Sequence, residues 1–384
     1  MTGALVNQIG RLLILCTLGC VTLGVFEGSA IAAQASPEQV LDGVACARCR
    51  VDRRTRVVLT SRTIEGEINE LPYGVRVDPT GNFWVLAENS PPRSYGPTGV
   101  FNRTLGRTGQ GPGELLAVHD MFWVPGDSVV TMDAVNRRAT VFTSGGRYVR
   151  DIRLPAPLFH AIVLRWPSQV LVSGHVATSS AAGLPLHFAS FADADMKLVR
   201  SFGPDRGLLR PRYQGADWHL TARRHDGTIV TAKPDQFRLH IWDDDGSLRS
   251  SIARRSAWFP DSGGGSNGTP NQPPTPAITA IDVDRDGLIW VFVRVAAPTW
   301  RQAWARVPPG AREARLSEVD FQSLYRTRVE VIDPASRRVV ATVDMPGLTL
   351  AALGGGRVAV YAADAVGDPV VRIEQLRLVQ PSRP

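Results

Sequence analysis

Short apolar runs alternate with polar turns along most of the chain, and residues 127–148 hold the clearest example. Residues 128–132 form an apolar, β-branched run, and the polar turn 133–138 follows it. A second apolar run, 139–143, leads through the tight turn 144–146 into a third. Runs of this length between Gly, Asn and Asp residues are typical of antiparallel strands. The segment therefore predicts consecutive strands joined by short turns.

The same order of strand and turn recurs along the sequence in six repeats. Their first strands are expected at residues 74–78, 118–124, 161–165, 220–224, 278–283 and 348–352. The last repeat supplies only three strands, whereas residues 56–63 form an isolated run ahead of the first repeat. Pairing this run into the last repeat leaves no major sheet edge bare. We therefore predict an all-β fold, a six-bladed β-propeller whose N-terminal strand completes the last blade.

Two stretches carry a resemblance to known families. The first resembles an NHL-type repeat through Asp133, Asn136, Arg137, Arg138, Val141, Phe142, Gly145 and Gly146. The second, LGRTGQGPGE at 105–114, is similar to a segment common in exported bacterial six-bladed β-propeller proteins. The resemblance spans residues 54–379 and implies the fold. Because one fold can host many functions, it implies no particular activity.

The N-terminus has the features of an export signal. Arg11 precedes the apolar run 12–26, and Ala-Gln-Ala at 33–35 is a small-x-small cleavage site. We therefore expect residues 1–35 to be a signal peptide and the mature protein to be periplasmic or extracellular, without a transmembrane span. The small residue before Cys20 keeps lipid anchoring at that cysteine open as an alternative.

The mature chain is expected to have three parts. Residues 36–53 form an N-terminal segment with a Cys-x-x-Cys motif, residues 54–379 form the propeller, and residues 380–384 form a tail. In an oxidising compartment Cys46 and Cys49 are expected to form a local disulfide. A redox-active pair is the alternative.

Charge narrows the range of partners. The net charge is +7, and arginine supplies nearly all of the positive charge because Lys197 and Lys233 are the chain's lysines. The arginines are spread along the sequence, which argues against a stripe that binds nucleic acid. A small molecule, peptide or protein is therefore the expected partner, and the oligomeric state stays open.

Connection lengths predict which face of the propeller binds a ligand. The turns between first and second strands are short, as at 79–81 and 285–287. The connections 203–217, 254–277 and 294–327 are long, and strand alternation places them on the opposite face. Long loops at one rim of a rigid scaffold are where ligand contacts normally lie. We expect the ligand site on this long-loop face.

One position of the repeat carries unusual chemistry. Counting back eight residues from the end of each first turn gives Tyr73, His119, His160, His219, Thr279 and Leu348. The position lies where the innermost strand begins, at the mouth of the central channel. Histidine occupies it in three consecutive repeats. We expect a ligand site here, with Tyr73, Thr279 and Trp218 as further contacts.

The three histidines raise the question of a metal ion. Three imidazoles that leave a position open for water are a common catalytic zinc arrangement. The pattern resembles the peptide-amidating lyase propeller, which holds zinc with three histidines, and more loosely streptogramin lyase and the gluconolactonase-like propellers. The resemblance implies Zn²⁺ or another divalent cation on His119, His160 and His219. The alternative is that these histidines are polar residues lining the channel.

Two classes of function follow from these features. The first is a non-enzymatic binding or interaction module with its site over the channel mouth. The second is a metal-dependent lyase or lactone hydrolase, in which Tyr73 or a loop residue acts as acid or base. The sequence leaves open whether the protein is an enzyme.

Overall fold

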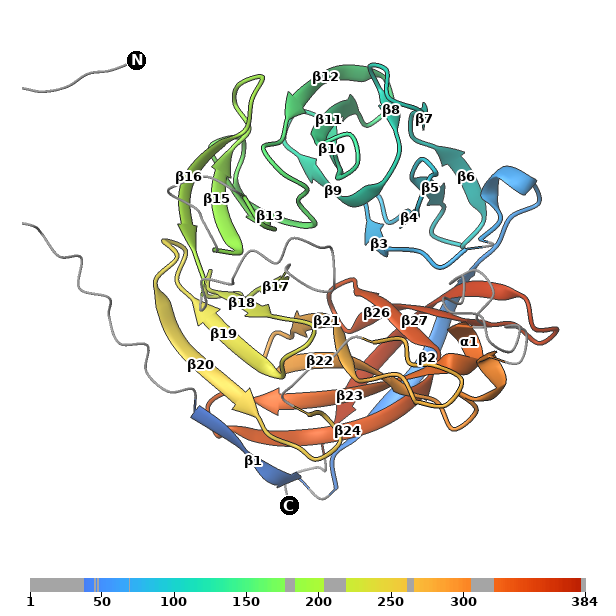
Figure 1. Ribbon diagram of the computed structural model, residues 1–384, viewed down its shortest axis with the longest axis vertical. Helices are drawn as coiled ribbons and strands as arrows, with labels where there is room; N and C mark the ends of the chain where they lie inside the picture. Colours follow the sequence, from blue (N-terminus) through green and yellow to red (C-terminus); the bar gives the residue numbers. More distant parts are fainter. Residues whose placement is uncertain are drawn as a thin grey trace, which may run out of the picture. The chain divides into compact units, whose positions relative to one another are not determined.

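The strands build six four-stranded antiparallel blades around a centre (Figure 1). The computed structural model describes residues 38–44, 46, 48–68, 70–176, 184–203, 219–260, 266–304 and 321–380. The predicted all-β, six-bladed propeller is confirmed. The proposed signal peptide, its alternative anchor at Cys20 and residues 381–384 of the C-terminal tail lie outside the described residues.

Each blade runs from an innermost to an outermost strand. Blades 1 to 3 are β3 (Gly74–Val77), β4 (Phe83–Leu86), β5 (Arg93–Tyr95) and β6 (Phe101–Thr104); β9 (Val118–Val124), β10 (Ser128–Asp133), β11 (Arg138–Thr143) and β12 (Tyr148–Arg153); β13 (His160–Arg165), β14 (Gln169–Ser173), β15 (Leu186–Ser190) and β16 (Lys197–Phe202). Blades 4 to 6 are β17 (Leu220–Arg223), β18 (Ile229–Ala232), β19 (Arg238–Trp242) and β20 (Leu248–Arg254); β21 (Ala277–Val283), β22 (Ile289–Ala296), β23 (Tyr325–Asp333) and β24 (Arg338–Pro346); β25 (Leu348–Ala352), β26 (Arg357–Ala363), β27 (Pro369–Val379) and β2 (Arg50–Leu59).

The innermost hairpins of blades 1 and 5 turn on the same Asp-x-x-Gly sequence. The carboxylates of Asp78 and Asp284 each accept two backbone N–H groups inside their turns. The glycines that end these turns have φ angles of +89° and +81°. A residue with a side chain would be strained in this backbone conformation. The indole Nε1 of Trp84 donates to Asp78 at 3.1 Å, and Trp290 donates to Asp284 at 2.9 Å. Local sequence thus fixes both hairpins and anchors a large core side chain to each.

An N-terminal strand closes the ring, as predicted. β2 pairs antiparallel with β27, so that blade 6 combines the two ends of the propeller sequence. The strand covers Arg50–Leu59 rather than residues 56–63. Its first half is polar and arginine-rich, so the apolar run marked only its end.

A further N-terminal strand was not predicted. β1 (Glu38–Val44) runs parallel to β20 and to β24 and joins blades 4 and 5 into a nine-stranded sheet. Figure 1 shows β1 beside both outer strands. Parallel pairing to strands more than 200 residues away leaves no local pattern in the sequence. The segment 36–53 is therefore largely part of the sheets.

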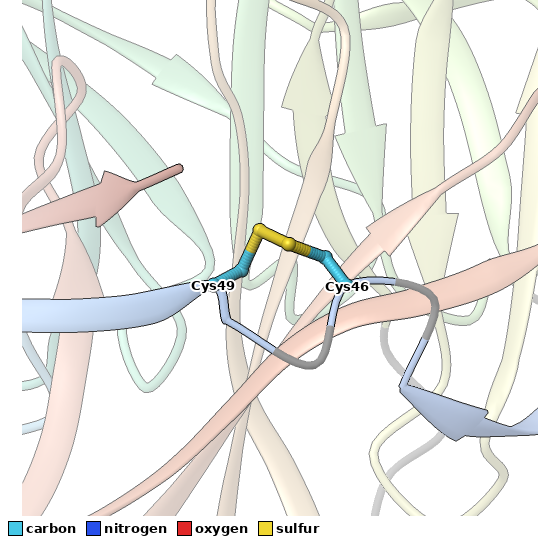
Figure 2. Close-up of a disulfide and its surroundings, with 2 residues drawn as sticks. All are labelled: Cys46 and Cys49. Carbon is cyan, nitrogen blue, oxygen red and sulfur yellow. A yellow bond between two sulfur atoms is a disulfide. The ribbon is translucent and has the colours of Figure 1, made fainter. Parts of the chain in front are cut away.

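A disulfide lies at the turn between β1 and β2. Cys46 and Cys49 are bonded with an S–S distance of 1.99 Å and a Cα–Cα distance of 5.3 Å (Figure 2). Both cysteines are partly buried and pack beside the apolar cluster between blades 5 and 6. The bond lies within the short connection between the strand that joins blades 4 and 5 and the strand that completes blade 6.

The outer half of blade 1 gives little signal in the sequence. Its third and fourth strands, β5 and β6, have three and four residues. β5 is Arg-Ser-Tyr, and Arg93 is 6% exposed because its guanidinium donates to Glu70 at 3.0 Å and to the Glu67 carbonyl. A buried arginine in a three-residue strand gives no apolar run to recognise.

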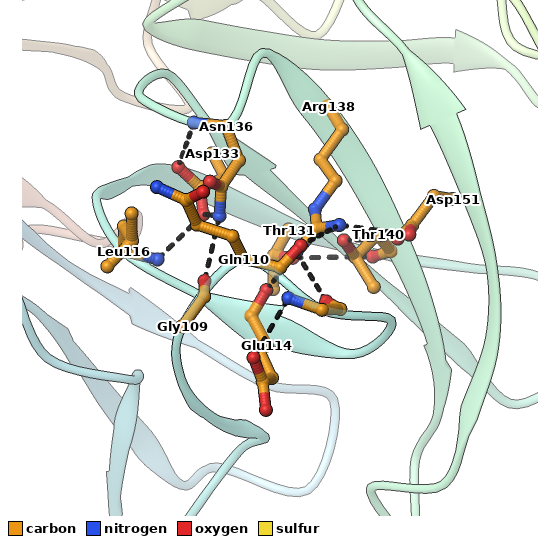
Figure 3. Close-up of polar contacts among 11 residues, drawn as sticks. Gly109, Gln110, Glu114, Leu116, Thr131, Asp133, Asn136, Arg138, Thr140 and Asp151 are labelled. Carbon is orange, nitrogen blue, oxygen red and sulfur yellow. Dashed lines mark hydrogen bonds and ion pairs between the residues drawn. The ribbon is translucent and has the colours of Figure 1, made fainter.

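The glycine-rich segment at 105–114 links blade 1 to blade 2 (Figure 3). Arg138 donates to the carbonyls of Gln110 and Gly111 at 3.1 and 2.7 Å and pairs with Asp151 at 3.2 Å. Asn136 donates to the Gly109 carbonyl at 3.1 Å. The polar residues that resembled an NHL-type repeat therefore hold this link against blade 2.

Candidate functional site

The structure places the sequence-predicted positions at one end of the innermost strands. Tyr73 precedes β3, His119 is the second residue of β9, His160 begins β13, and His219 precedes β17. This is the end at which the longest connections enter and leave the blades, such as 255–276 between β20 and β21. Trp218 lies outside the described residues.

Three aromatic side chains at the starts of consecutive inner strands meet at this end. The rings of Tyr73 and His119 stack with centroids 4.3 Å apart and planes 18° apart. Phe159 meets His119 edge-on, with ring centroids 5.1 Å apart. Aromatic contacts of this kind favour a defined ring orientation, and Tyr73 remains 38% exposed.

His119 is held as a neutral imidazole with a defined proton. Burial lowers the pKa of His119, and this effect outweighs the nearby carboxylates of Asp133, Glu88 and Asp120, which raise it. Its Nδ1 lies 3.1 Å from the Ala117 carbonyl oxygen. Because a carbonyl can only accept, Nδ1 carries the proton and Nε2 keeps its lone pair.

The Tyr73 hydroxyl lies in a negative field. Burial, followed by charge and hydrogen-bond interactions with Glu88, raises the pKa of Tyr73, and Glu70 adds to the rise. Glu70 is compensated by Arg93 at 3.0 Å, whereas Glu88 is exposed. Glu88 also forms an isolated antiparallel bridge with Ala117, which brings blade 1 against blade 2 beside His119. The phenol is therefore protonated at neutral pH and lies next to an exposed carboxylate.

Asp120 connects three blades directly below the aromatic contact. It is 1% exposed, and its Oδ1 accepts Nε of Arg76 in blade 1 at 2.7 Å and its own neighbour's N–H from Met121 at 2.7 Å. Its Oδ2 accepts the Ala161 N–H of blade 3 at 2.7 Å and lies 4.0 Å from Nδ1 of His160. Burial lowers the pKa of His160 to about 4, despite the opposing effect of Asp120. His160 is therefore neutral at pH 7.

His219 is tied to blade 3 through Ser173. It is 4% exposed, and its backbone N–H donates to Ser173 Oγ at 2.7 Å. Ser173 is also the residue of β14 that pairs with His160 in β13. Burial lowers the pKa of His219 to about 3, and His240, Lys233 and His175 lower it further.

The three-histidine metal site expected from the sequence stays a prediction. Among the described residues, which include His119, His160 and His219, no group of three or more His, Cys, Asp or Glu side chains is placed to hold a metal ion. The imidazoles differ in their contacts: Nδ1 of His119 lies 3.1 Å from the Ala117 carbonyl oxygen, Nδ1 of His160 lies 4.0 Å from the Asp120 carboxylate, and the buried Nδ1 of His219 has no hydrogen-bond partner among the described residues. The Thr279 hydroxyl, a further expected contact, donates to the Phe292 carbonyl at 3.4 Å.

Sequence reasoning missed Asp120, Arg76, Glu88 and Phe159. Two of them adjoin predicted residues, since Asp120 follows His119 and Phe159 precedes His160. Arg76 and Glu88 carry no signal of their own, because only the packing of blade 1 against blade 2 brings them to the site.

The sequence matches no family model and no curated protein. Among solved structures, a DUF4221 family member from Bacteroides vulgatus is 11% identical with a TM-score of 0.59, covering 86% of this chain and 99% of that one. A Bacteroides fragilis protein named as exported is 10% identical with a TM-score of 0.54, covering 89% and 99%. No helix among the described residues is long and apolar enough to cross a membrane. At these identities the likeness shows the fold alone: the chain is a six-bladed β-propeller similar to these two proteins.

Proposed function

We propose that this protein is a binding module whose ligand site lies over the channel mouth at Tyr73, His119 and His160. The observation that carries the proposal is the contact between Tyr73 and His119, which leaves a half-exposed phenol ring stacked on a neighbouring blade. An exposed aromatic face held rigidly, with a carboxylate from Glu88 beside it, provides both contact area and polar recognition. The partner is a small molecule, or a side chain of a peptide or protein.

The protonation states support binding more than catalysis. His119 and His160 are neutral at pH 7, and burial and its neighbours hold the Tyr73 phenol protonated. Asp120 accepts three hydrogen bonds, so its carboxylate is committed to holding the blades together. A general acid or base works best with a pKa near the working pH. The pKa values of His119 and His160 are lowered and that of Tyr73 is raised, so each shift is away from neutral pH. Whether the protein is an enzyme stays open.

The proposal is tested by ligand screening against the mature protein, followed by NMR on its histidine and tyrosine side chains. A true ligand should shift the ring resonances of His119 and Tyr73 and lose at least about tenfold in affinity for Tyr73→Ala, because an aromatic contact of this size is worth over 1 kcal/mol.

The matched control is Tyr148→Ala, which removes a tyrosine of 37% exposure from the outer strand of blade 2. Ligands that bind equally well to both variants, or that shift resonances only elsewhere, would show that the site is wrong.

A further inference from the structure

The outer strand of blade 6 concentrates positive charge. Residues 48–56 contain five arginines, and all five are exposed: Arg48, Arg50, Arg53, Arg54 and Arg56. The strand β2 is the outermost strand of its blade. The arginines are spread along the sequence as a whole, but these five are concentrated in and beside β2, at the outer edge of blade 6.

Little acidic charge offsets these arginines. Arg50 pairs with Asp52 at 2.9 Å, and Arg53 lies 3.5 Å from the buried Glu374. For Arg48, Arg54 and Arg56, no acidic side chain lies within ion-pair distance in the part of the chain that the structure describes. The neighbouring strand β27 adds Arg377 directly opposite Asp52. The five arginines of residues 48–56 together with Arg377 form a strip, the arginine strip, whose surface charge is positive.

Exposed apolar side chains lie at the end of the same strip. Val58 near the end of β2 is 36% exposed, Ile64 in η1 (Ile64–Gly66) is 84% exposed, and Val100 is 48% exposed. They belong to one area: Thr60 bridges Val100, and the Thr104 hydroxyl of β6 donates to Glu65 of η1 at 2.9 Å. Moving an exposed apolar side chain from water into an apolar phase lowers its free energy.

We propose that this basic and apolar edge binds the surface of an anionic phospholipid bilayer. Arginines near such a surface are attracted to lipid phosphates, and adjacent apolar side chains can enter the boundary of the acyl chains. A linear polyanion such as duplex DNA would use the arginines but would gain nothing from Ile64 and Val100. Protection of an edge strand against aggregation explains charged residues, but it leaves the neighbouring exposed apolar group unexplained.

Binding of the mature protein to vesicles tests this proposal. We expect co-sedimentation with vesicles of equal phosphatidylglycerol and phosphatidylcholine, weak binding to phosphatidylcholine alone, and release by added salt. The variant Arg48→Gln/Arg54→Gln/Arg56→Gln should lower the partition coefficient on the order of 100-fold, since each arginine near the surface contributes roughly fivefold.

A control variant separates the strip from net charge alone. Arg147→Gln/Arg223→Gln/Arg285→Gln removes the same charge from exposed arginines in blades 2, 4 and 5 and should keep most of the binding. The variant Ile64→Ser/Val100→Ser should lower vesicle binding about tenfold at constant charge, as expected for loss of partial apolar burial. Unchanged thermal unfolding would show that the variants are folded.

Several results would overturn the proposal. One is that the unmodified protein does not co-sediment with anionic vesicles. This result counts against the proposal even if the arginine variant aggregates. Another is an equal loss of binding in the control variant. A third is tight binding to duplex DNA with no effect of Ile64→Ser/Val100→Ser on either partner, which would identify the strip as a general polyanion site.

Discussion

Arg254 at the end of β20 and Glu330 in β23 form a buried ion pair between blades 4 and 5. Nε and an η nitrogen of Arg254 lie 3.0 and 3.3 Å from the two carboxylate oxygens of Glu330. Their side chains are 9% and 3% exposed. Val40 of β1 lies opposite Arg254 in the sheet, so the pair lies where the N-terminal strand joins the two blades.

The variant Glu330→Gln should therefore destabilise the protein by about 3 kcal/mol, because it removes the carboxylate charge that pairs with a buried guanidinium. Urea unfolding measures the change in free energy. The control is Asp52→Asn, which breaks an ion pair whose side chains are 71% and 54% exposed and should cost under about 1 kcal/mol. Equal losses in the free energy of unfolding for the two variants would show that breaking the buried ion pair costs no more than breaking the exposed one.

A second prediction concerns the link between blades 1 and 2. Arg138→Ala removes the donors to the carbonyls of Gln110 and Gly111 and the ion pair with Asp151. We expect a loss of about 2 kcal/mol in stability and faster amide exchange in residues 107–115 than in the rest of blade 2. The exposed Arg147→Ala is the control. Unchanged exchange in this segment would contradict the role given to Arg138.

A third prediction follows from two histidines whose pKa values are lowered in the folded protein. The pKa of His219 is about 3 and that of His160 about 4 in the folded protein, both lowered from 6.5. Below pH 6.5 the unfolded chain binds protons that the folded protein does not. The free energy of unfolding therefore decreases as the pH is lowered, until the folded pKa is reached. Each histidine contributes a slope of about 1.4 kcal/mol per pH unit in this window.

Asp282 acts in the opposite direction between about pH 6 and its ordinary pKa of 3.8, because burial raises its folded pKa to about 6. Urea unfolding at several values between pH 4.5 and 7 should therefore show a net loss of stability on acidification, and His219→Gln should reduce the slope by up to about 1.4 kcal/mol per pH unit. An identical slope in this variant would mean that His219 does not resist protonation.

A fourth prediction addresses the metal hypothesis. Because no group of three or more His, Cys, Asp or Glu side chains among the described residues is placed to hold a metal ion, we expect no stoichiometric Zn²⁺ or other divalent ion on these three residues. Elemental analysis and thermal unfolding with and without a chelator check this directly. About one equivalent of metal that is lost in both His160→Ala and His219→Ala would show that the histidines do converge on an ion.

The sequence predicted much of the propeller but less of its site. Turn residues such as Asp78 and its following glycine carry their structure locally, so the hairpins and the number of blades could be counted. The starting positions of the inner strands also followed, which placed Tyr73 and His119 on one face. The stacking of these two rings did not follow, because a repeat position fixes the backbone and not the direction of a side chain.

By itself the sequence determined the blade repeat, the six-bladed count and the closure of the ring by an N-terminal strand. These features depend on short-range turn chemistry and on the alternation of apolar and polar residues. Only the tertiary structure decided that β1 joins blades 4 and 5, that Asp120 connects three blades, and that Tyr73 stacks on His119. These contacts join residues far apart in the chain, where packing between blades, rather than local preference, determines which groups meet.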